Sequence, residues 1–408
     1  MDKKLQMYAE LIVKQGLNLE KGEMLAISAD IECAPLADAV AEFAYKAGAC
    51  RVVMFWGSPK QGKLAYQYQS DETLREVPDY VVASRDYLIE KKAAYLGIAS
   101  ELPDFLSDVD PEKIKISTIA SSIALKRFRE STGSNKTRWC LCAYPNETWA
   151  KKVFPGLTAE KALGKMWDYV YKTLRMDTPD PLTAWKKHEH DLERRSVILN
   201  DAGIESLTFK NSLGTDFEVW LPEGYVFSGA AEKSFYGRAF TANLPTEEVF
   251  CSPDYRKAEG KVVSSLPLVR RGAIIKNFWF EFKGGAVVDF GAEDGYETLK
   301  GIIESDEGAR YLGEVALVGY NSPIQNLKTL FYCTLFDENA SCHLAVGRGF
   351  GACLKGGLEM TKDELKERGI NDSLEHVDFM IGTPDLSVVA KKRGGGNMVI
   401  FKDGDWTF

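Results

Sequence analysis

Residues 23–56 read EMLAISADIECAPLADAVAEFAYKAGACRVVMFW and contain the pattern that decides the fold of the first half. Two short apolar runs, at 23–28 and 51–56, have the composition of buried strands. Between them, apolar residues from Leu36 to Ala47 recur at helical spacing, and Gly48 follows where a helix would end. A strand, a helix and a second strand within about thirty residues predict a βαβ unit with parallel strands.

The same alternation continues with AAYLGIAS at 93–100 and RWCLCAYP at 138–145. We therefore predict that the first half is an α/β domain with an open, largely parallel sheet flanked by helices. Neither GxGxxG nor GxxxxGK follows the first strand, which argues against a nucleotide site in this domain.

The stretch MDTPDPLTAW at 176–185 contains prolines and aspartates, and it marks a break before a new helix. We place the domain boundary there, giving an α/β domain at 1–180 and a catalytic domain at 181–408. The second domain is predicted to be mainly β, of the α+β class, with a few helices such as TKDELKERG at 361–369. Its strand candidates are SLTFK (206–210), DFEVWL (216–221), GAIIKNFWFEF (272–282) and GAVVDFG (285–291).

The composition is that of an ordinary globular protein, with 45% hydrophobic and 27% charged residues in a chain of 408. A net charge of −8 without a long basic run argues against nucleic acid or an anionic membrane as the main partner. The N-terminal residues lack the apolar core of a signal peptide, and no stretch has the length of a membrane span. Eight cysteines without a CxxC motif suggest reduced thiols, so we expect a cytoplasmic protein.

The four histidines fall into two groups. His188 and His190 lie in the charged stretch AWKKHEHDLERR, which predicts a solvent-exposed helix face. His343 instead lies in TLFDENASCHLAVGRGF, residues 334–350, beside Glu338 and among apolar residues. An ionised glutamate in such surroundings needs a partner, because burying an unpaired charge costs several kcal/mol or more.

The remaining histidine, His376, is two residues before Asp378 in the strand-like run HVDFMIG. Period-two alternation places both side chains on one face, where they form either a structural pair or a pair of metal ligands. Glu314, in YLGEVALVGY, is another isolated carboxylate in an apolar run. The adjacent Glu247 and Glu248 would point to opposite faces of an extended segment, so only one of them can enter a shared site.

Three of these motifs, NLPTEEVFCSPD, LFDENASCHLAVG and HVDFMIG, resemble in order and spacing the aminopeptidase T/aminopeptidase S family of dinuclear metalloaminopeptidases, the thermophilic metallopeptidase type. The resemblance covers most of the second domain, and the α/β pattern of the first domain suits the family. It implies a cytoplasmic enzyme that releases N-terminal residues from short peptides, and a homodimer.

The resemblance also implies six ligands for two divalent metal ions, with Glu314 as the natural bridge and Glu248, rather than Glu247, facing inward as the catalytic residue. The set is Glu248, Glu314, Glu338, His343, His376 and Asp378. Four carboxylates balance the formal charge of two dications, so such a cluster can be buried at a moderate electrostatic cost. Carboxylates with two imidazoles suit zinc, cobalt or manganese.

Phe350 departs from the family pattern, which has a tyrosine seven residues after the loop histidine. A phenyl ring keeps the shape but lacks the hydroxyl that could donate a hydrogen bond to the developing oxyanion. The alternative hypothesis is therefore a catalytically weakened or inactive homologue that binds metal and peptide. The stretch TPDLSVVAKKRGGGN at 383–397 also departs from the acidic, glycine-containing family pattern, which bears on substrate preference.

Overall fold

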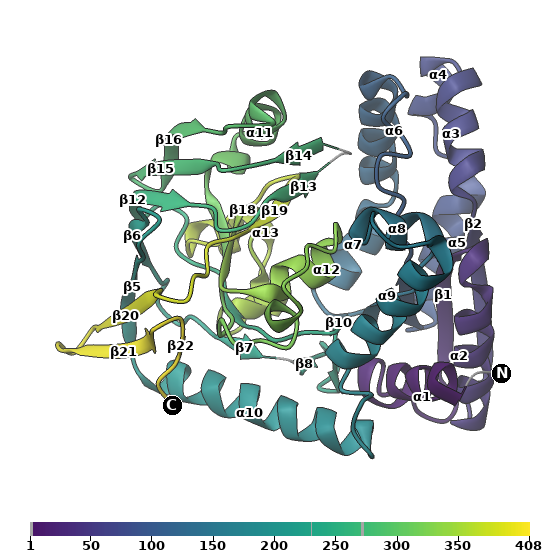
Figure 1. Cartoon of the computed structure of the whole chain (residues 1–408), viewed down its shortest axis with the longest axis horizontal. Helices are drawn as coiled ribbons and strands as arrows, with labels where there is room; N and C mark the ends of the chain where they lie inside the picture. The colour runs from purple at the N-terminus through teal and green to yellow at the C-terminus, as the bar shows by residue number, and fades with distance from the viewer. Residues whose placement is uncertain (1–2, 230, 271–272) are drawn as a thin grey trace. The chain divides into compact units, whose positions relative to one another are not determined.

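The computed structural model describes residues 3–229, 231–270 and 273–408. The chain forms two compact units (Figure 1). Unit 1 comprises Met1–Trp185 and Ala231–Leu244, and unit 2 comprises Lys186–Ala230 and Pro245–Phe408. None of the helices in the described ranges is both long enough and apolar enough to span a membrane.

Unit 1 is built on a five-stranded sheet in the order β10-β4-β3-β1-β2, and every pairing in it is parallel. The predicted βαβ unit is present, since β1 and β2 pair in parallel and α2 connects them. The predicted open parallel sheet with flanking helices is confirmed. The strands of the sheet are β1 (Met24–Asp30), β2 (Arg51–Gly57), β3 (Ala94–Ala99), β4 (Trp139–Ala143) and β10 (Asn243–Leu244), and a separate pair consists of β8 (Glu232–Lys233) and β9 (Ala239–Phe240). The helices are α1 (Lys3–Leu11), α2 (Ala34–Lys46), α3 (Pro59–Tyr68), α4 (Asp71–Arg75), α5 (Asp79–Glu90), α6 (Pro111–Ala124), α7 (Lys126–Gly133), α8 (Glu147–Val153) and α9 (Ala159–Thr173).

The segment Ala231–Leu244 returns to unit 1, which the sequence analysis did not anticipate. Its last two residues form β10, which pairs with β4 at the edge of the parallel sheet. A strand of two residues is too short to show an alternating apolar pattern in the sequence, so it can be recognised only by its pairing with β4. The functional boundary that we placed after residue 180 stays a prediction.

The helix α10 (Pro181–Asp201) runs through the point where unit 1 ends and unit 2 begins. Unit 2 then consists mainly of antiparallel strands, as predicted for the mainly β second half. Its strands are β5 (Ile204–Lys210), β6 (Asp216–Trp220), β7 (Ser228–Gly229), β11 (Val249–Cys251), β12 (Ala258–Val263), β13 (Leu268–Arg270), β14 (Ala273–Ile275), β15 (Trp279–Lys283), β16 (Ala286–Gly291), β17 (Leu312–Leu317), β18 (His343–Gly347), β19 (His376–Met380), β20 (Ser387–Lys392), β21 (Asn397–Lys402) and β22 (Asp405–Trp406). Its helices are α11 (Tyr296–Ile303), α12 (Thr334–Asp337) and α13 (Lys362–Glu367), and a 3₁₀ turn, η5, spans Glu338–Ala340.

One predicted strand of unit 2, at 272–282, is wrong as a continuous element. Residue 272 lies outside the described residues, and the rest divides into β14 and β15. Between them, Asn277 has a φ of +48°, in the left-handed region. Asparagine tolerates this conformation better than most residues, so the chain turns there and separates the two strands.

Two sheets of unit 2 pack face to face. The first, which we call the site sheet, has the order β19-β18-β17-β11-β7, and the second has eight strands in the order β16-β15-β12-β6-β5-β20-β21-β22. Phe379 of the site sheet lies 5.0 Å from Phe280 of the larger sheet, measured between ring centroids. Alternation along each strand therefore gives one face of the site sheet to the apolar core and leaves the opposite face for other side chains.

Candidate metal centre

One face of the site sheet collects acidic and imidazole side chains. Glu314 of β17 and Asp378 of β19 are both opposite Ala345 of β18, the strand between them, so the three residues form one row across these strands. His343, two residues before Ala345, is on the same face and opposite Ala316. Because alanine adds only a methyl group, the middle of the row leaves space above the sheet between the two carboxylates.

The same register places His376 on this face, two residues before Asp378. Its Nε2 lies 3.1 Å from Glu314 Oε2 and 3.2 Å from Asp378 Oδ1. The pairing of His376 and Asp378 expected from period-two spacing is therefore present, and Glu314 completes a group of three.

Glu248 directly precedes β11 and faces the same cluster. Its Oε2 lies 3.2 Å from Nε2 of His343, and both residues are buried. The neighbouring Glu247 points elsewhere, with its Oε2 3.6 Å from Nε2 of His188. Of the two adjacent acids, Glu248 is thus the one that lies with the other candidate ligands.

Each of the two candidate imidazoles has its second ring nitrogen close to a backbone carbonyl. Nδ1 of His343 is 3.2 Å from the carbonyl oxygen of Ser341, and Nδ1 of His376 is 2.7 Å from that of Arg348. A carbonyl can only accept, so these contacts keep a proton on Nδ1. Nε2 therefore faces the carboxylates, to which it donates a hydrogen bond while the imidazole is protonated, and it can bind a cation once that proton leaves. This arrangement is typical of histidines that bind a metal through Nε2.

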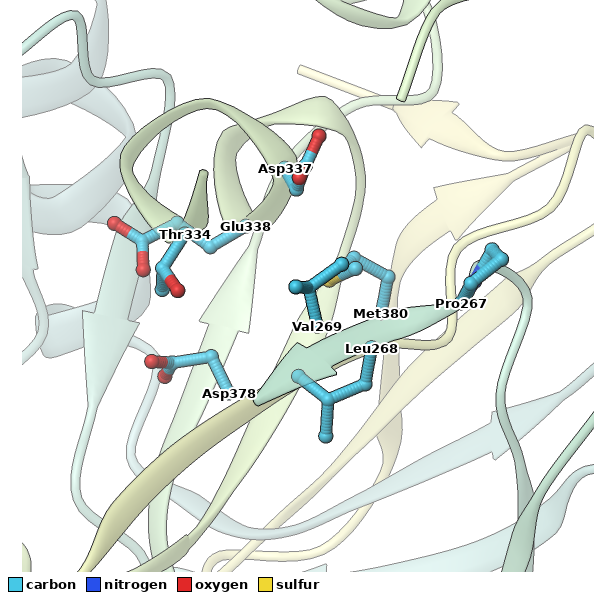
Figure 2. Close-up of a pocket in the computed structure, with 8 residues that line it drawn as sticks. All are labelled: Pro267, Leu268, Val269, Thr334, Asp337, Glu338, Asp378 and Met380. Carbon is cyan, nitrogen blue, oxygen red and sulfur yellow. The ribbon is translucent and has the colours of Figure 1, made fainter. Parts of the chain in front are cut away.

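The sixth candidate, Glu338, comes from the turn η5 and not from the sheet. It lines a small cavity of about 10 Å³ together with Asp378. Figure 2 shows the polar groups of Thr334, Glu338 and Asp378 on one side of this cavity, with Leu268, Val269 and Met380 on the other. The space is about that of one water molecule, and it lies directly beside two carboxylates.

The cluster contains two groups of three donors, each with its donor atoms within 4.8 Å of one another. One group is Glu248, Glu314 and His343, and the other is Glu314, His376 and Asp378. Glu314 belongs to both groups, so a single carboxylate with two oxygens is placed where two neighbouring cation positions would meet.

Burial and mutual repulsion strongly shift the protonation of this cluster. Burial raises the pKa of Glu314, and burial together with the charges of Asp378 and Glu248 raises that of Glu338 well above its usual range. Burial alone would lower the pKa of His343, but the hydrogen bond to Glu248 and its charge raise it to about 10. Without a cation, protons must therefore supply the positive charge that four buried carboxylates require.

Asp378 differs from the two raised glutamates. Burial acts to raise its pKa, but the charge of His376 and the hydrogen bond from it outweigh burial and lower the pKa. Burial likewise acts to lower the pKa of His376, and the charge of Asp378 raises it well above the ordinary value. Carboxylates and neutral imidazoles are donors that zinc, cobalt and manganese accept, so the donor set fits divalent metal binding.

Phe350 lies at the edge of the cluster. Its ring centroid is 4.9 Å from that of His376 in an edge-on arrangement, and 5.9 Å from that of Phe250. Its backbone N–H donates to Ser252 Oγ at 2.8 Å, which fixes the start of the following turn. The residue that lacks the family's hydroxyl is thus in direct contact with a candidate metal ligand.

The sequence analysis missed two residues next to the cluster. His188 was expected on a solvent-exposed helix face, but its side chain is only 11% exposed and its Nε2 lies 2.8 Å from the carbonyl oxygen of Thr246. Asn339 is fully buried and contacts both Glu338 and the backbone of Glu247. His188 lies in a charge-rich stretch that is typical of an exposed helix, so its burial could not be predicted. No sequence signal distinguishes Asn339 from an ordinary turn asparagine. His190, by contrast, is exposed as expected.

The comparison with known proteins identifies the family of the chain. The model of a family described as thermophilic metalloprotease (M29) matches residues 1–406. The chain is thus a metal-dependent hydrolase of peptide bonds. It belongs to the thermophilic metalloprotease family, which confirms the resemblance seen in the three motifs.

Similar proteins match over the full length. "Aminopeptidase 2" of Geobacillus stearothermophilus is 40% identical over 407 residues, covering 100% of this chain and 98% of the relative. "Aminopeptidase PepS" of Streptococcus thermophilus is 39% identical, with 98% and 97% covered. The solved structure of wild-type AmpT from Thermus thermophilus superimposes with a TM-score of 0.92 at 33% identity, covering 100% of this chain and 99% of the other.

Proposed function

We propose that this enzyme is an aminopeptidase that uses two divalent metal ions to release N-terminal residues from short peptides. Two ions rather than one are supported by the two groups of three donors, which share Glu314. The ions would be held by Glu248, Glu314 and His343 on one side and by Glu314, His376 and Asp378 on the other, with Glu338 beside them. Zinc, cobalt and manganese all suit this donor set.

When bound, two such ions lower the pKa of a water and polarise the carbonyl of the substrate. The protein's own residues do the rest. We assign Glu248 the proton transfer, because its buried carboxylate faces the cluster and would be placed to accept a proton from an attacking water. The two backbone carbonyls at Nδ1 hold the imidazoles in the orientation in which Nε2 points inward.

The alternative is a weakened homologue that binds metal and peptide but cleaves slowly, because Phe350 offers no hydroxyl. The contact between Phe350 and His376 supports an effect on the reaction, because the ring that lacks the hydroxyl packs against a candidate metal ligand. We favour a working enzyme, because all six candidate ligands are present and five of them approach one another on one sheet face. The homodimer and the cytoplasmic location stay predictions.

Metal removal tests the proposed function. Exhaustive treatment with a chelator should abolish release of the N-terminal residue from aminoacyl chromogenic substrates and short peptides. Zinc, cobalt or manganese should restore it, with two ions per chain in the most active form, measured by elemental analysis. Unchanged cleavage by metal-free protein would refute the mechanism, whereas metal binding without cleavage would favour the weakened homologue.

A further inference from the structure

Glu248 follows a peptide bond that two side chains hold from opposite ends. The carbonyl oxygen of Thr246 lies 2.8 Å from Nε2 of His188, and the N–H of Glu247 donates to Oδ1 of Asn339 at 2.8 Å. These two backbone groups belong to the same peptide unit, which is planar and rigid. We call this arrangement, His188 and Asn339 on the Thr246–Glu247 peptide, the peptide clamp.

The clamp joins distant parts of unit 2. His188 comes from α10, and Asn339 comes from the turn η5. Asn339 also donates through Nδ2 to the carbonyl oxygen of Leu335 at 3.1 Å and to Oε1 of Glu338 at 3.3 Å. One fully buried amide therefore contacts both the segment that leads into Glu248 and the carboxylate of Glu338.

Glu248 needs such support, since it precedes β11 and no strand pairing fixes its own backbone. The other sheet ligands are held by ladder pairs within β17, β18 and β19. A loop residue that binds a cation must be fixed by other contacts, because errors of about 0.5 Å in ligand position already weaken a site.

We infer that His188 and Asn339 are positioning residues that set Glu248 and Glu338 at the distance required for metal binding. This inference rests on the proposed two-metal function. Neither residue needs to touch an ion or the substrate. Outer partners of this kind typically contribute about 10–100-fold to metal affinity when they are removed.

The first test compares Asn339→Leu with Asn200→Leu. Asn200 is a matched control, because its amide also donates to and accepts from one backbone position, that of Phe227, in the same unit. Calorimetric titration of metal-free protein with Zn²⁺ should show about 10–100-fold weaker binding for Asn339→Leu and wild-type affinity for Asn200→Leu. Both variants lose hydrogen bonds to the backbone, which are buried at Asn339 and partly buried at Asn200, so thermal stability of the metal-free proteins controls for simple unfolding.

The second test varies the donor at position 188. His188→Leu removes the hydrogen bond to the Thr246 carbonyl and should weaken zinc binding, whereas His188→Gln keeps a donor and should retain most of the affinity. His190→Leu on the same helix, at an exposed position, should change nothing. A saturating metal concentration should restore kcat of His188→Leu with little change in KM, because the defect lies in the placement of ligands.

The outcomes separate the two ideas. Wild-type affinity in both Asn339→Leu and His188→Leu would overturn the clamp while leaving the proposed function intact. Equal losses in Asn200→Leu and Asn339→Leu would also overturn it, because they would indicate a general structural effect. Wild-type protein that binds no divalent metal would overturn the proposed function and the clamp together. If Asn339→Leu does not fold, the zinc affinities of Asn339→Ser and His188→Leu are compared with wild type instead. Wild-type affinity in both of these variants would overturn the clamp.

Discussion

Phe350 is the residue at which we expect a single substitution to change the chemistry most. Its ring packs against that of His376, a candidate metal ligand, with the ring centroids 4.9 Å apart. In Phe350→Tyr we expect a rise in kcat, at most about 10²–10³-fold, since that is the usual contribution of one oxyanion donor. Steady-state kinetics with an aminoacyl chromogenic substrate would measure it.

The matched control is Phe290→Tyr, which adds the same hydroxyl to another partly buried ring of unit 2 outside the cluster. It should leave kcat unchanged. If Phe350→Tyr also leaves kcat unchanged, a missing hydroxyl does not limit the reaction, and the ions or another donor stabilise the oxyanion.

The histidines of the cluster predict a pH dependence of metal binding. In metal-free protein the pKa of His343 is raised to about 10, so its imidazole is protonated at pH 7. A cation can bind Nε2 only after this proton leaves, so binding releases protons and metal affinity rises as pH increases toward 10. Calorimetry at pH 7 in two buffers of different ionisation enthalpy should detect a release of about one or two protons. Binding without net proton release would contradict the assigned role of His343.

At the level of elements, strand β18, which lies between β17 and β19, carries a small residue where the candidate ligands meet. Ala345 is fully buried between Glu314 and Asp378. Valine suits a strand as well as alanine does, but its two extra methyl groups would enter the space between the carboxylates. Overpacking costs about 1–3 kcal/mol, so Ala345→Val should weaken metal binding by about 5- to 150-fold if that cost falls on the bound form.

Val346→Ile is the control for this substitution, because it adds volume to the same strand on the opposite, core-facing side. It should lower the temperature of unfolding and leave metal affinity unchanged, as measured by calorimetry. Equal loss of affinity in both variants would show that β18 acts through general packing and not through the face that carries the ligands.

At the level of the whole molecule, the two compact units each have an apolar core, one including Met24, Leu88 and Phe128 and the other including Phe280 and Phe379. All six candidate ligands belong to unit 2. A ligand that binds only folded protein stabilises the part that it binds. We therefore expect two thermal transitions in scanning calorimetry, of which a chelator lowers only one.

Limited proteolysis would assign that transition to unit 2, because fragments of unit 2 should appear first in the presence of the chelator. Chelation that shifts both transitions equally would show that the two units unfold as one. Chelation that shifts neither would contradict a structural contribution of the ions.

The sequence by itself determined the parallel sheet of unit 1 and the strand character of unit 2, because these follow from local apolar periods of 2 and 3.6 residues. Charged residues in apolar runs also drew attention to single candidate ligands, and the family resemblance implied the full set of six. Only the tertiary structure decided that Glu248 lies with the cluster and Glu247 beside His188, and that Ala345 separates Glu314 from Asp378. It also revealed the peptide clamp and the return of Ala231–Leu244 to unit 1. These features depend on the register between strands and on contacts between residues up to about 100 positions apart in the chain, and no local period encodes them.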